Sequence, residues 1–123
     1  MKTVLVIEDN PDNILLISDI LEANDYRVLQ AETGLKGIEM AEENLPDFII
    51  LDIQLPDIIG NEVVKRLRKK TETQFIPVVA MTSYAMAGDR EKLLAAGCNG
   101  YVEKPINPRN VMEQLNQAIG NKI

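Results

Sequence analysis

The feature of the sequence that most constrains its fold is a set of short, continuously apolar runs separated by helical segments. The run Phe48–Leu51 holds four apolar residues in succession and is followed by one carboxylate, Asp52. A strand with one face in solvent alternates apolar and polar residues, whereas a parallel strand covered on both faces is apolar throughout. The run therefore predicts a buried parallel strand, and it raises the question of why such a strand ends on an acid.

Five β-rich runs, three of them continuously apolar, alternate with five segments of helical periodicity, without a linker, repeat or low-complexity tract between them. The runs are TVLVIE, YRVLQAE, DFIILD, IPVVAMT and GYVE, at residues 3–8, 26–32, 47–52, 76–82 and 100–103. Strand followed by helix, five times over, predicts an α/β fold with a doubly wound five-stranded parallel sheet and five helices.

Proline and glycine residues mark the expected ends of the helices. Asn10 before Pro11, and Asn107 before Pro108, are each interpreted as an N-cap followed by proline at the first helical position. Gly97 and Gly120 each follow a helical segment, and we expect both to end a helix.

Length and composition narrow the possible classes of protein. The 123 residues fit one domain, and the net charge of −6 argues against nucleic acid as the direct ligand. The single cysteine, Cys98, excludes an internal disulfide and suits a reducing cytoplasm. No apolar stretch approaches the roughly 18 residues of a membrane span, so we expect no membrane insertion. Histidine is absent, which excludes histidine-based catalytic triads and metal sites on this chain.

The residues that end the strands are the ones to inspect for function. In a doubly wound sheet, ligands bind in a crevice at the carboxyl ends of the strands, where the strand order reverses. The chemically capable side chains that end these strands are Glu8, Asp9, Asp52, Thr82 and Lys104. We therefore expect three carboxylates, a hydroxyl and an ammonium group to meet at one edge of the sheet.

This combination of charges favours a magnesium-dependent phosphoryl site. Three carboxylates alone repel one another, and a divalent cation such as Mg²⁺ relieves the repulsion while keeping several of its waters. Lys104 adds a compact positive charge that suits a phosphoryl oxygen. The acid at the end of the apolar strand, Asp52, then has two roles open to it, as a metal ligand and as the nucleophile of an aspartyl phosphate.

At this point the sequence resembles the response regulator receiver domains of two-component signalling. The resemblance rests on IED at residues 7–9, DIQLPDIIG at 52–60, MTS at 81–83 and KP at 104–105, which occur in order along the whole chain. EDNPDN, AMTSYAMAGD and GCNGYVEKPI further resemble the stand-alone, DivK-like branch of the family. The resemblance implies the strand order 2-1-3-4-5 and a single receiver domain over residues 1–123, without an effector domain.

The resemblance also implies a role for each site residue. Asp52 would accept a phosphoryl group from a partner's phosphohistidine, on a sensor histidine kinase or a histidine phosphotransfer protein. Asp9, Asp52 and the main-chain carbonyl of Gln54 would bind Mg²⁺, with Glu8 nearby and often acting through water. Lys104, before a cis proline, would contact the phosphoryl group.

A phosphorylation switch follows from the same resemblance. Thr82 would turn toward the new phosphate and Tyr101 would rotate inward, changing the surface offered to a downstream protein target. Tyr84 would flank the path of the hydrolytic water, and Met86 would belong to the docking face. From the residues alone, a half-buried core tyrosine explains Tyr101 about as well as a switch does.

The basic cluster Lys65–Lys70 has a simpler interpretation. The expected end of the third helix carries the members of this cluster: Lys65, Arg66, Arg68, Lys69 and Lys70. Cations at a helix C-terminus complement its dipole, so we expect a solvated helix end rather than an anion site.

Two other classes of protein share parts of this pattern. A flavin or dinucleotide carrier holds phosphate on a glycine-rich first loop, whereas EDNPDN would repel it. A haloacid-dehalogenase-like phosphatase shares the strand-end aspartate, Mg²⁺, threonine and lysine, and is the alternative function. By resemblance, that family needs a second aspartate two residues after the nucleophile, where this chain has Gln54. We expect a signalling protein rather than an enzyme acting on a metabolite.

Overall fold

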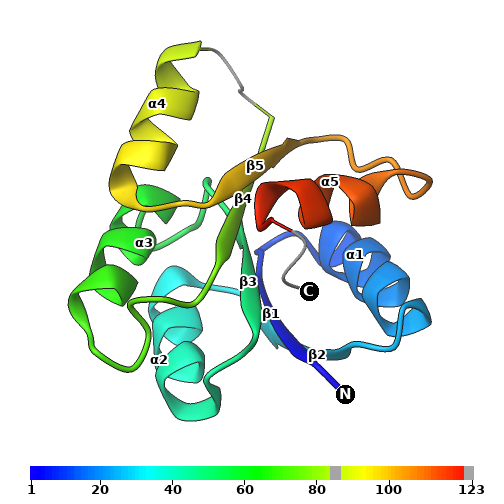
Figure 1. Cartoon of the computed structure of the whole chain (residues 1–123), viewed down its shortest axis with the longest axis horizontal. Coiled ribbons are helices and arrows are strands. Elements are labelled where there is room, and N and C mark those ends of the chain that lie inside the picture. The colour runs from blue at the N-terminus through cyan, green and yellow to red at the C-terminus, as the bar shows by residue number, and fades with distance from the viewer. Residues whose placement is uncertain (84–86, 121–123) are drawn as a thin grey trace.

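The computed structural model describes residues 1–83 and 87–120 of the chain. Five parallel strands form one sheet in the order β2-β1-β3-β4-β5, as predicted (Figure 1). The strands are β1 (Thr3–Ile7), β2 (Arg27–Ala31), β3 (Phe48–Asp52), β4 (Val78–Thr82) and β5 (Gly100–Glu103). The strand order reverses between β1 and β3, and the chemically active edge of such a sheet lies at the carboxyl ends of these strands.

Five helices cover the two faces of the sheet. They are α1 (Pro11–Ala23), α2 (Gly34–Asn44), α3 (Gly60–Lys69), α4 (Ala87–Ala96) and α5 (Val111–Ala118). Figure 1 shows α1 and α5 on one side of the sheet and α2, α3 and α4 on the other. Each side has its own apolar core, which includes Ile17 and Leu115 on the first side and Ala41 and Leu67 on the second.

The continuous apolar runs become the most deeply buried strands. All five residues of β3 and of β4 are buried, and so are four of the five residues of β1. The outer strands β2 and β5 are only partly buried, because each has a neighbour on one side only. The prediction of parallel strands covered on both faces is confirmed, and the buried strand β3 includes Asp52 at its end.

The helix boundaries predicted from asparagine and proline are half correct. Asn10 is the N-cap of α1, where its side chain accepts bonds from the N–H groups of Asp12 and Asn13. The prediction for Asn107 is wrong, because α5 begins at Val111. The Asn107 side chain accepts from the Arg109 N–H, and its carbonyl accepts from the N–H groups of residues 110 and 111. These bonds close a turn that precedes the helix.

Both predicted glycine stops are confirmed. Gly97 follows the last residue of α4 and has φ 113°, and Gly120 follows the end of α5 with φ 68°. Such left-handed backbone is open to glycine at little cost, so both positions end a helix where any other residue would be strained.

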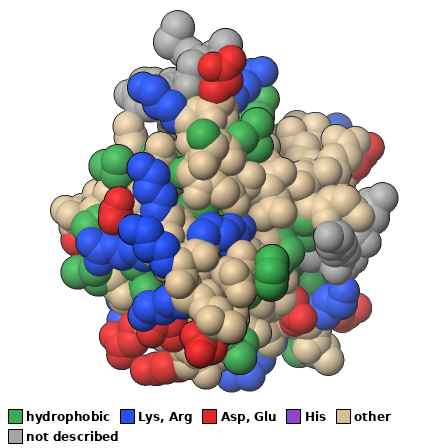
Figure 2. Space-filling model, turned by 60° about the vertical axis from the view of Figure 1, so that its left-hand side comes forward, with side chains coloured by type: hydrophobic (Ala, Val, Ile, Leu, Met, Phe, Trp, Pro, Cys, Tyr) green, Lys and Arg blue, Asp and Glu red, His purple; other side chains and the backbone are tan. Residues whose placement is uncertain are grey.

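The basic cluster at the end of α3 corrects one expectation. Arg68 is not simply solvated, because its guanidinium donates to the carbonyls of Ile76 (2.7 Å) and Gly97 (2.9 Å) and to the side chain of Asn99 (3.1 Å). It therefore joins the end of α3 to the segments before β4 and before β5. Another cation of the cluster, Lys70, pairs with Glu42. Basic and acidic side chains are also neighbours on the face of the molecule that Figure 2 shows.

No helix among the described residues has the length and apolar character needed to cross a membrane.

The close approach of α5 to β5 gives a test of the packing. A Cβ on Gly100 would lie 2.6 Å from the Ala118 Cβ and 3.0 Å from its Cα. We expect Gly100→Ala to lower the free energy of unfolding by about 1–3 kcal/mol, because overpacking forces backbone shifts. Urea unfolding measures the loss. In a double-mutant cycle, Ala118→Gly should relieve part of it, and strictly additive effects would contradict the assigned contact.

Candidate functional site

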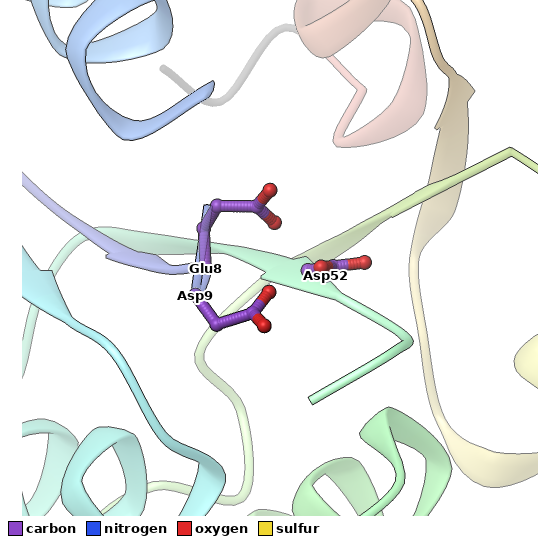
Figure 3. A group of neighbouring side chains, drawn as sticks. All are labelled: Glu8, Asp9 and Asp52. Atoms are coloured by element: carbon purple, nitrogen blue, oxygen red, sulfur yellow. The ribbon is translucent and has the colours of Figure 1, made fainter. Parts of the chain in front are cut away.

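The ends of β1 and β3 bring three carboxylates together. Glu8 and Asp9 follow β1, and Asp52 ends β3, the strand beside it. One oxygen from each of the three carboxylates lies within 4.8 Å of the others, and Figure 3 shows the three side chains directed to the same space. Glu8 and Asp52 are buried, at 2% and 5% exposure, whereas Asp9 is exposed. Parallel register alone accounts for this meeting of residues that are 44 positions apart.

Lys104 lies against two of these carboxylates. It follows β5, and its Nζ is 3.0 Å and 3.2 Å from the two oxygens of Glu8 and 3.4 Å from Oδ2 of Asp52. The Lys104–Pro105 peptide bond is cis, as the family resemblance implied. One ammonium group thus faces two buried acids, with the third acid nearby. This contact explains how a buried apolar strand can end on an acid, since the charge of Asp52 is partly compensated by an ammonium group that follows the edge strand β5.

Two further hydrogen bonds orient the acids. The Asn13 side-chain amide donates to Oε1 of Glu8 at 2.8 Å, and the Gln54 main-chain N–H donates to Oδ1 of Asp52 at 3.1 Å. Gln54 is among the residues that the sequence predicts at the site, whereas Asn13 is not. The position of Asn13 in the sequence could have indicated this contact. Asn13 lies in the first turn of a helix that begins beside Glu8, and side chains of that turn point back toward the end of the strand.

Burial dominates the electrostatics of Glu8. Loss of solvent around the carboxyl, followed by its hydrogen bond with Asp52, raises the pKa of Glu8 to about 7, against the lowering effect of Asn13 and Lys104. Glu8 therefore holds a proton well above the ordinary range of a glutamate. Without a further cation, the site relieves part of its negative charge by protonation.

Thr82 and Tyr101 extend the site along β4 and β5. Thr82 ends β4 and is buried, and its carbonyl accepts from the Lys104 N–H at 2.9 Å. Tyr101 is half-buried in β5. The Arg90 guanidinium of α4 lies 4.8 Å from the centre of the Tyr101 ring and 3.2 Å from a carboxylate oxygen of Glu103. Sequence reasoning missed Arg90, because nothing local links it to a strand ten residues later.

Two residues considered in the sequence analysis, Tyr84 and Met86, lie outside the described residues.

The donor set fits a hard divalent cation. Carboxylate oxygens are the ligands that Mg²⁺ prefers, and Glu8, Asp9 and Asp52 offer one oxygen each within a space of the right size. Three carboxylates against one lysine also leave an excess of negative charge at a largely buried place. The acidic residues therefore cluster as in a metal site.

A family comparison agrees with this geometry. The family model of the response regulator receiver domain matches residues 4–116, which is nearly the whole chain. The chain belongs to the response regulator receiver family of two-component signalling. The fold found here, with strand order 2-1-3-4-5 and five helices, is that of the family's solved structures.

Individual relatives define the similarity further. The polar-differentiation response regulator DivK of Brucella ovis is 39% identical over 120 residues, which is 98% of each chain. The receiver domain of the sensor histidine kinase PA1611 of Pseudomonas aeruginosa, solved with magnesium in its active-site cleft, is 33% identical with a TM-score of 0.87, covering 97% and 98% of the two chains. The receiver domain of Saccharomyces cerevisiae Ssk1, solved with the phosphotransfer protein Ypd1, is 26% identical with a TM-score of 0.84, covering 94% and 87%.

These relatives decide between the two functions considered for an aspartate at the end of β3, a receiver domain and a phosphatase. The chain is a receiver domain homologous to DivK, and the phosphatase alternative is not favoured. Gln54 at the position of the missing second aspartate is consistent with this result.

The raised pKa of Glu8 predicts a pH dependence of stability. Between its ordinary pKa of 4.5 and about 7 the folded chain holds a proton that the unfolded chain has lost. The free energy of unfolding should therefore fall as pH rises through this window, by up to about 1.4 kcal/mol per pH unit. Urea unfolding in EDTA measures the slope, and no histidine titrates in the window to obscure it.

Glu8→Gln is the matched variant, because the amide has the same shape and no charge to lose. Its stability should vary much less between pH 4.5 and 7 than that of the parent chain. An equal slope in both proteins would contradict the assignment of this proton to Glu8.

Proposed function

We propose that the chain is a single-domain response regulator in which Asp52 accepts a phosphoryl group and the receiver surface carries the output. The observation that supports it most directly is the meeting of Glu8, Asp9 and Asp52 within 4.8 Å, with the Lys104 ammonium 3.4 Å from Asp52. A nucleophile, a place for a cation and a fixed positive charge are thus adjacent. Residues 1–123 form one receiver domain in this proposal.

The transfer itself asks little covalent chemistry of the protein. An oxygen of Asp52 forms a bond to phosphorus while the bond from phosphorus to the partner's imidazole nitrogen breaks. The imidazole keeps that electron pair and takes up a proton. Catalysis then consists of holding Asp52 in line with the incoming group and of compensating negative charge. The Gln54 N–H bond to Oδ1 of Asp52 fixes one oxygen of the nucleophile and leaves the other facing Lys104.

A bound Mg²⁺ would supply charge neutralisation between the carboxylates and the phosphoryl oxygens. Asp9 and Asp52 would bind it directly in this proposal, together with the carbonyl of Gln54, and Glu8 would act nearby through water. The low exposure of Glu8 suits that role. The exposed position of Asp9 gives the ion a path from solvent.

Lys104 changes partners in the course of the reaction. In the structure its ammonium group is shared between Glu8 and Asp52. A phosphoryl group on Asp52 brings a charge near −2 to the same place and offers stronger acceptor oxygens. The ammonium group then moves from the carboxylates to the phosphate, which couples phosphorylation to the contacts of β5.

The partners follow from this chemistry. The phosphoryl donor is a phosphohistidine on a sensor histidine kinase or on a histidine phosphotransfer protein, in keeping with the Ypd1 complex of the Ssk1 receiver. The output is a contact with a downstream protein target, without nucleic acid or membrane insertion, and the chain works in the cytoplasm. It acts on its own aspartate and on no independent metabolite, so it is a signalling protein rather than an enzyme.

The switch uses Thr82 and Tyr101. Thr82 lies at the end of β4 beside the site, and its hydroxyl would turn to donate to a phosphate on Asp52. Its movement makes room for Tyr101, which is half-buried on the next strand. Arg90 opposes that inward rotation, because its guanidinium holds the ring and Glu103 together on the outside.

Phosphorylation of one aspartate is the first expectation of this proposal. Incubation with acetyl phosphate and Mg²⁺ should add one phosphoryl group, and peptide mapping should place it on Asp52. Intact-mass spectrometry measures the gain. EDTA should block it, because uncompensated carboxylates repel an incoming anion.

Asp52→Asn is the control, since its amide keeps the shape but is no nucleophile. Persistent labelling of another residue in that variant would show that Asp52 is not the acceptor. Labelling of Asp52 that survives EDTA would remove the role given to the metal.

The switch gives a separate expectation. Thr82→Ala should still accept phosphate on Asp52, yet beryllofluoride should no longer shift the NMR signals of Tyr101 and Arg90 as it does in the parent chain. Ser83→Ala is the matched control, because it removes a hydroxyl one residue further on, where the side chain is exposed. Equal shifts at Tyr101 in all three proteins would show that Thr82 does not transmit the signal.

A further inference from the structure

The loop between β3 and α3 is attached to a helix that lies beside it. Asp57, in this loop, accepts through Oδ1 from the Gly34 N–H at 2.8 Å and through Oδ2 from the Leu35 N–H at 2.9 Å. Gly34 and Leu35 are the first two residues of α2. One carboxylate therefore binds the N-terminus of α2 with both of its oxygens, across 22 and 23 positions of sequence.

This contact completes the capping of α2. The first N–H groups of a helix have no partner within the helix. Thr33, the N-cap, takes the N–H of Lys36 at 3.1 Å, and Asp57 takes the two that precede it. The bonds from the Leu35 and Gly34 N–H groups lower the pKa of Asp57, so its carboxylate is charged at the N-terminal end of the helix dipole.

Apolar contacts hold the same junction. Gly34 has no room for a side chain, because a Cβ there would lie 2.6 Å from Cγ1 of Ile58 and 2.9 Å from Cγ2 of Val63. Ile58 is half-buried and packs on the apolar core of the α2, α3 and α4 side. Asp57 and Ile58 thus place two successive residues of the loop against the start of α2.

The loop is also closed at its base. The Gly60 N–H donates to the Ile53 carbonyl at 2.9 Å, and a Cβ on Gly60 would lie 2.8 Å from the Ile53 Cα. Gln54 is the next residue after this closure, and its N–H is bonded to Asp52. The segment that carries the acceptor and the Gln54 carbonyl is therefore fixed at its base by Gly60 and at its far end by Asp57.

We propose that Asp57 is a positioning residue of the phosphorylation site. By binding the N-terminus of α2, it holds the β3–α3 loop in the shape that presents the Gln54 carbonyl and Asp52 to a divalent cation. Asp57 itself touches neither the cation nor the phosphoryl group. This inference rests on the metal site proposed above, and it adds a residue that the acidic cluster does not contain.

A plain helix cap is the alternative to be separated from this role. If Asp57 serves only α2, then its loss and the loss of the Thr33 cap should act alike, lowering stability and leaving the metal site unchanged. If Asp57 positions the loop, the loss of Asp57 should weaken Mg²⁺ binding, whereas the loss of the Thr33 cap should not. Thr33 is a matched control because its hydroxyl caps the same helix end, by accepting from the Lys36 N–H.

The experiment compares the parent chain with Asp57→Ala, Asp57→Asn and Thr33→Ala. Titration calorimetry gives the dissociation constant of Mg²⁺, thermal unfolding in EDTA gives Tm, and amide hydrogen exchange without metal reports on Gly34, Leu35 and Gln54. We expect Asp57→Ala to bind Mg²⁺ about tenfold more weakly, as when a supporting partner of a metal ligand is lost. Its Leu35 and Gln54 amides should also exchange faster.

The other variants should separate along the same lines. Asp57→Asn keeps one acceptor for the helix and should fall between Asp57→Ala and the parent, whereas Thr33→Ala should lose Tm but bind Mg²⁺ within about twofold of the parent. Equal Mg²⁺ binding in Asp57→Ala and Thr33→Ala would overturn the positioning role. So would an unchanged Gln54 exchange in Asp57→Ala. A parent chain that binds no Mg²⁺ would instead overturn the metal site, and the role of Asp57 toward it would fall as well.

Discussion

The contact on which the site depends is that of one lysine with two buried acids from other strands. Lys104 and Glu8 are 96 positions apart, and the sheet order places their strand ends near Asp52 on the central strand. Burial of a lone carboxylate is costly, and the ammonium group offsets part of that cost for two acids at once. It does not offset all of it, which is why Glu8 holds a proton to about pH 7 and why a cation suits the remaining space.

The two-sided core explains how this contact is held in place. β1, β3 and β4 are buried on both faces, so their ends are set by the packing of two apolar layers rather than by the site itself. The loops that follow β1 and β3 are fixed separately, by Asn10 at the start of α1 and by Asp57 at the start of α2. Charge can then be concentrated at the edge of the sheet without loosening it, because the supporting contacts lie outside the charged cluster.

The sequence was sufficient for features that depend on local pattern. Continuous apolar runs predicted the buried strands, and the residues after them predicted the three carboxylates and Lys104. It was insufficient where a contact joins distant segments. Arg68 was interpreted as a solvated helix end, although it binds carbonyls on two loops, because its partners are fixed only by the packing of α3 against its neighbours. The prediction of an N-cap at Asn107 was wrong for a local reason, since asparagine before proline also suits a turn.

Asp57 and Arg90 have in common that each belongs to neither the acidic cluster nor the core. Each is a charged side chain reaching from one element to another: Asp57 binds the N-terminus of α2, and Arg90 covers Tyr101 on β5. In the roles proposed above, Asp57 acts on a loop that keeps its shape, whereas Arg90 acts on a ring that moves. A contact of two backbone N–H groups with a charged carboxylate suits the first task, because charge-assisted bonds are the stronger ones. An exposed contact of a guanidinium with a ring and a carboxylate suits the second task, because such a contact is weak enough to be replaced in the proposed switch.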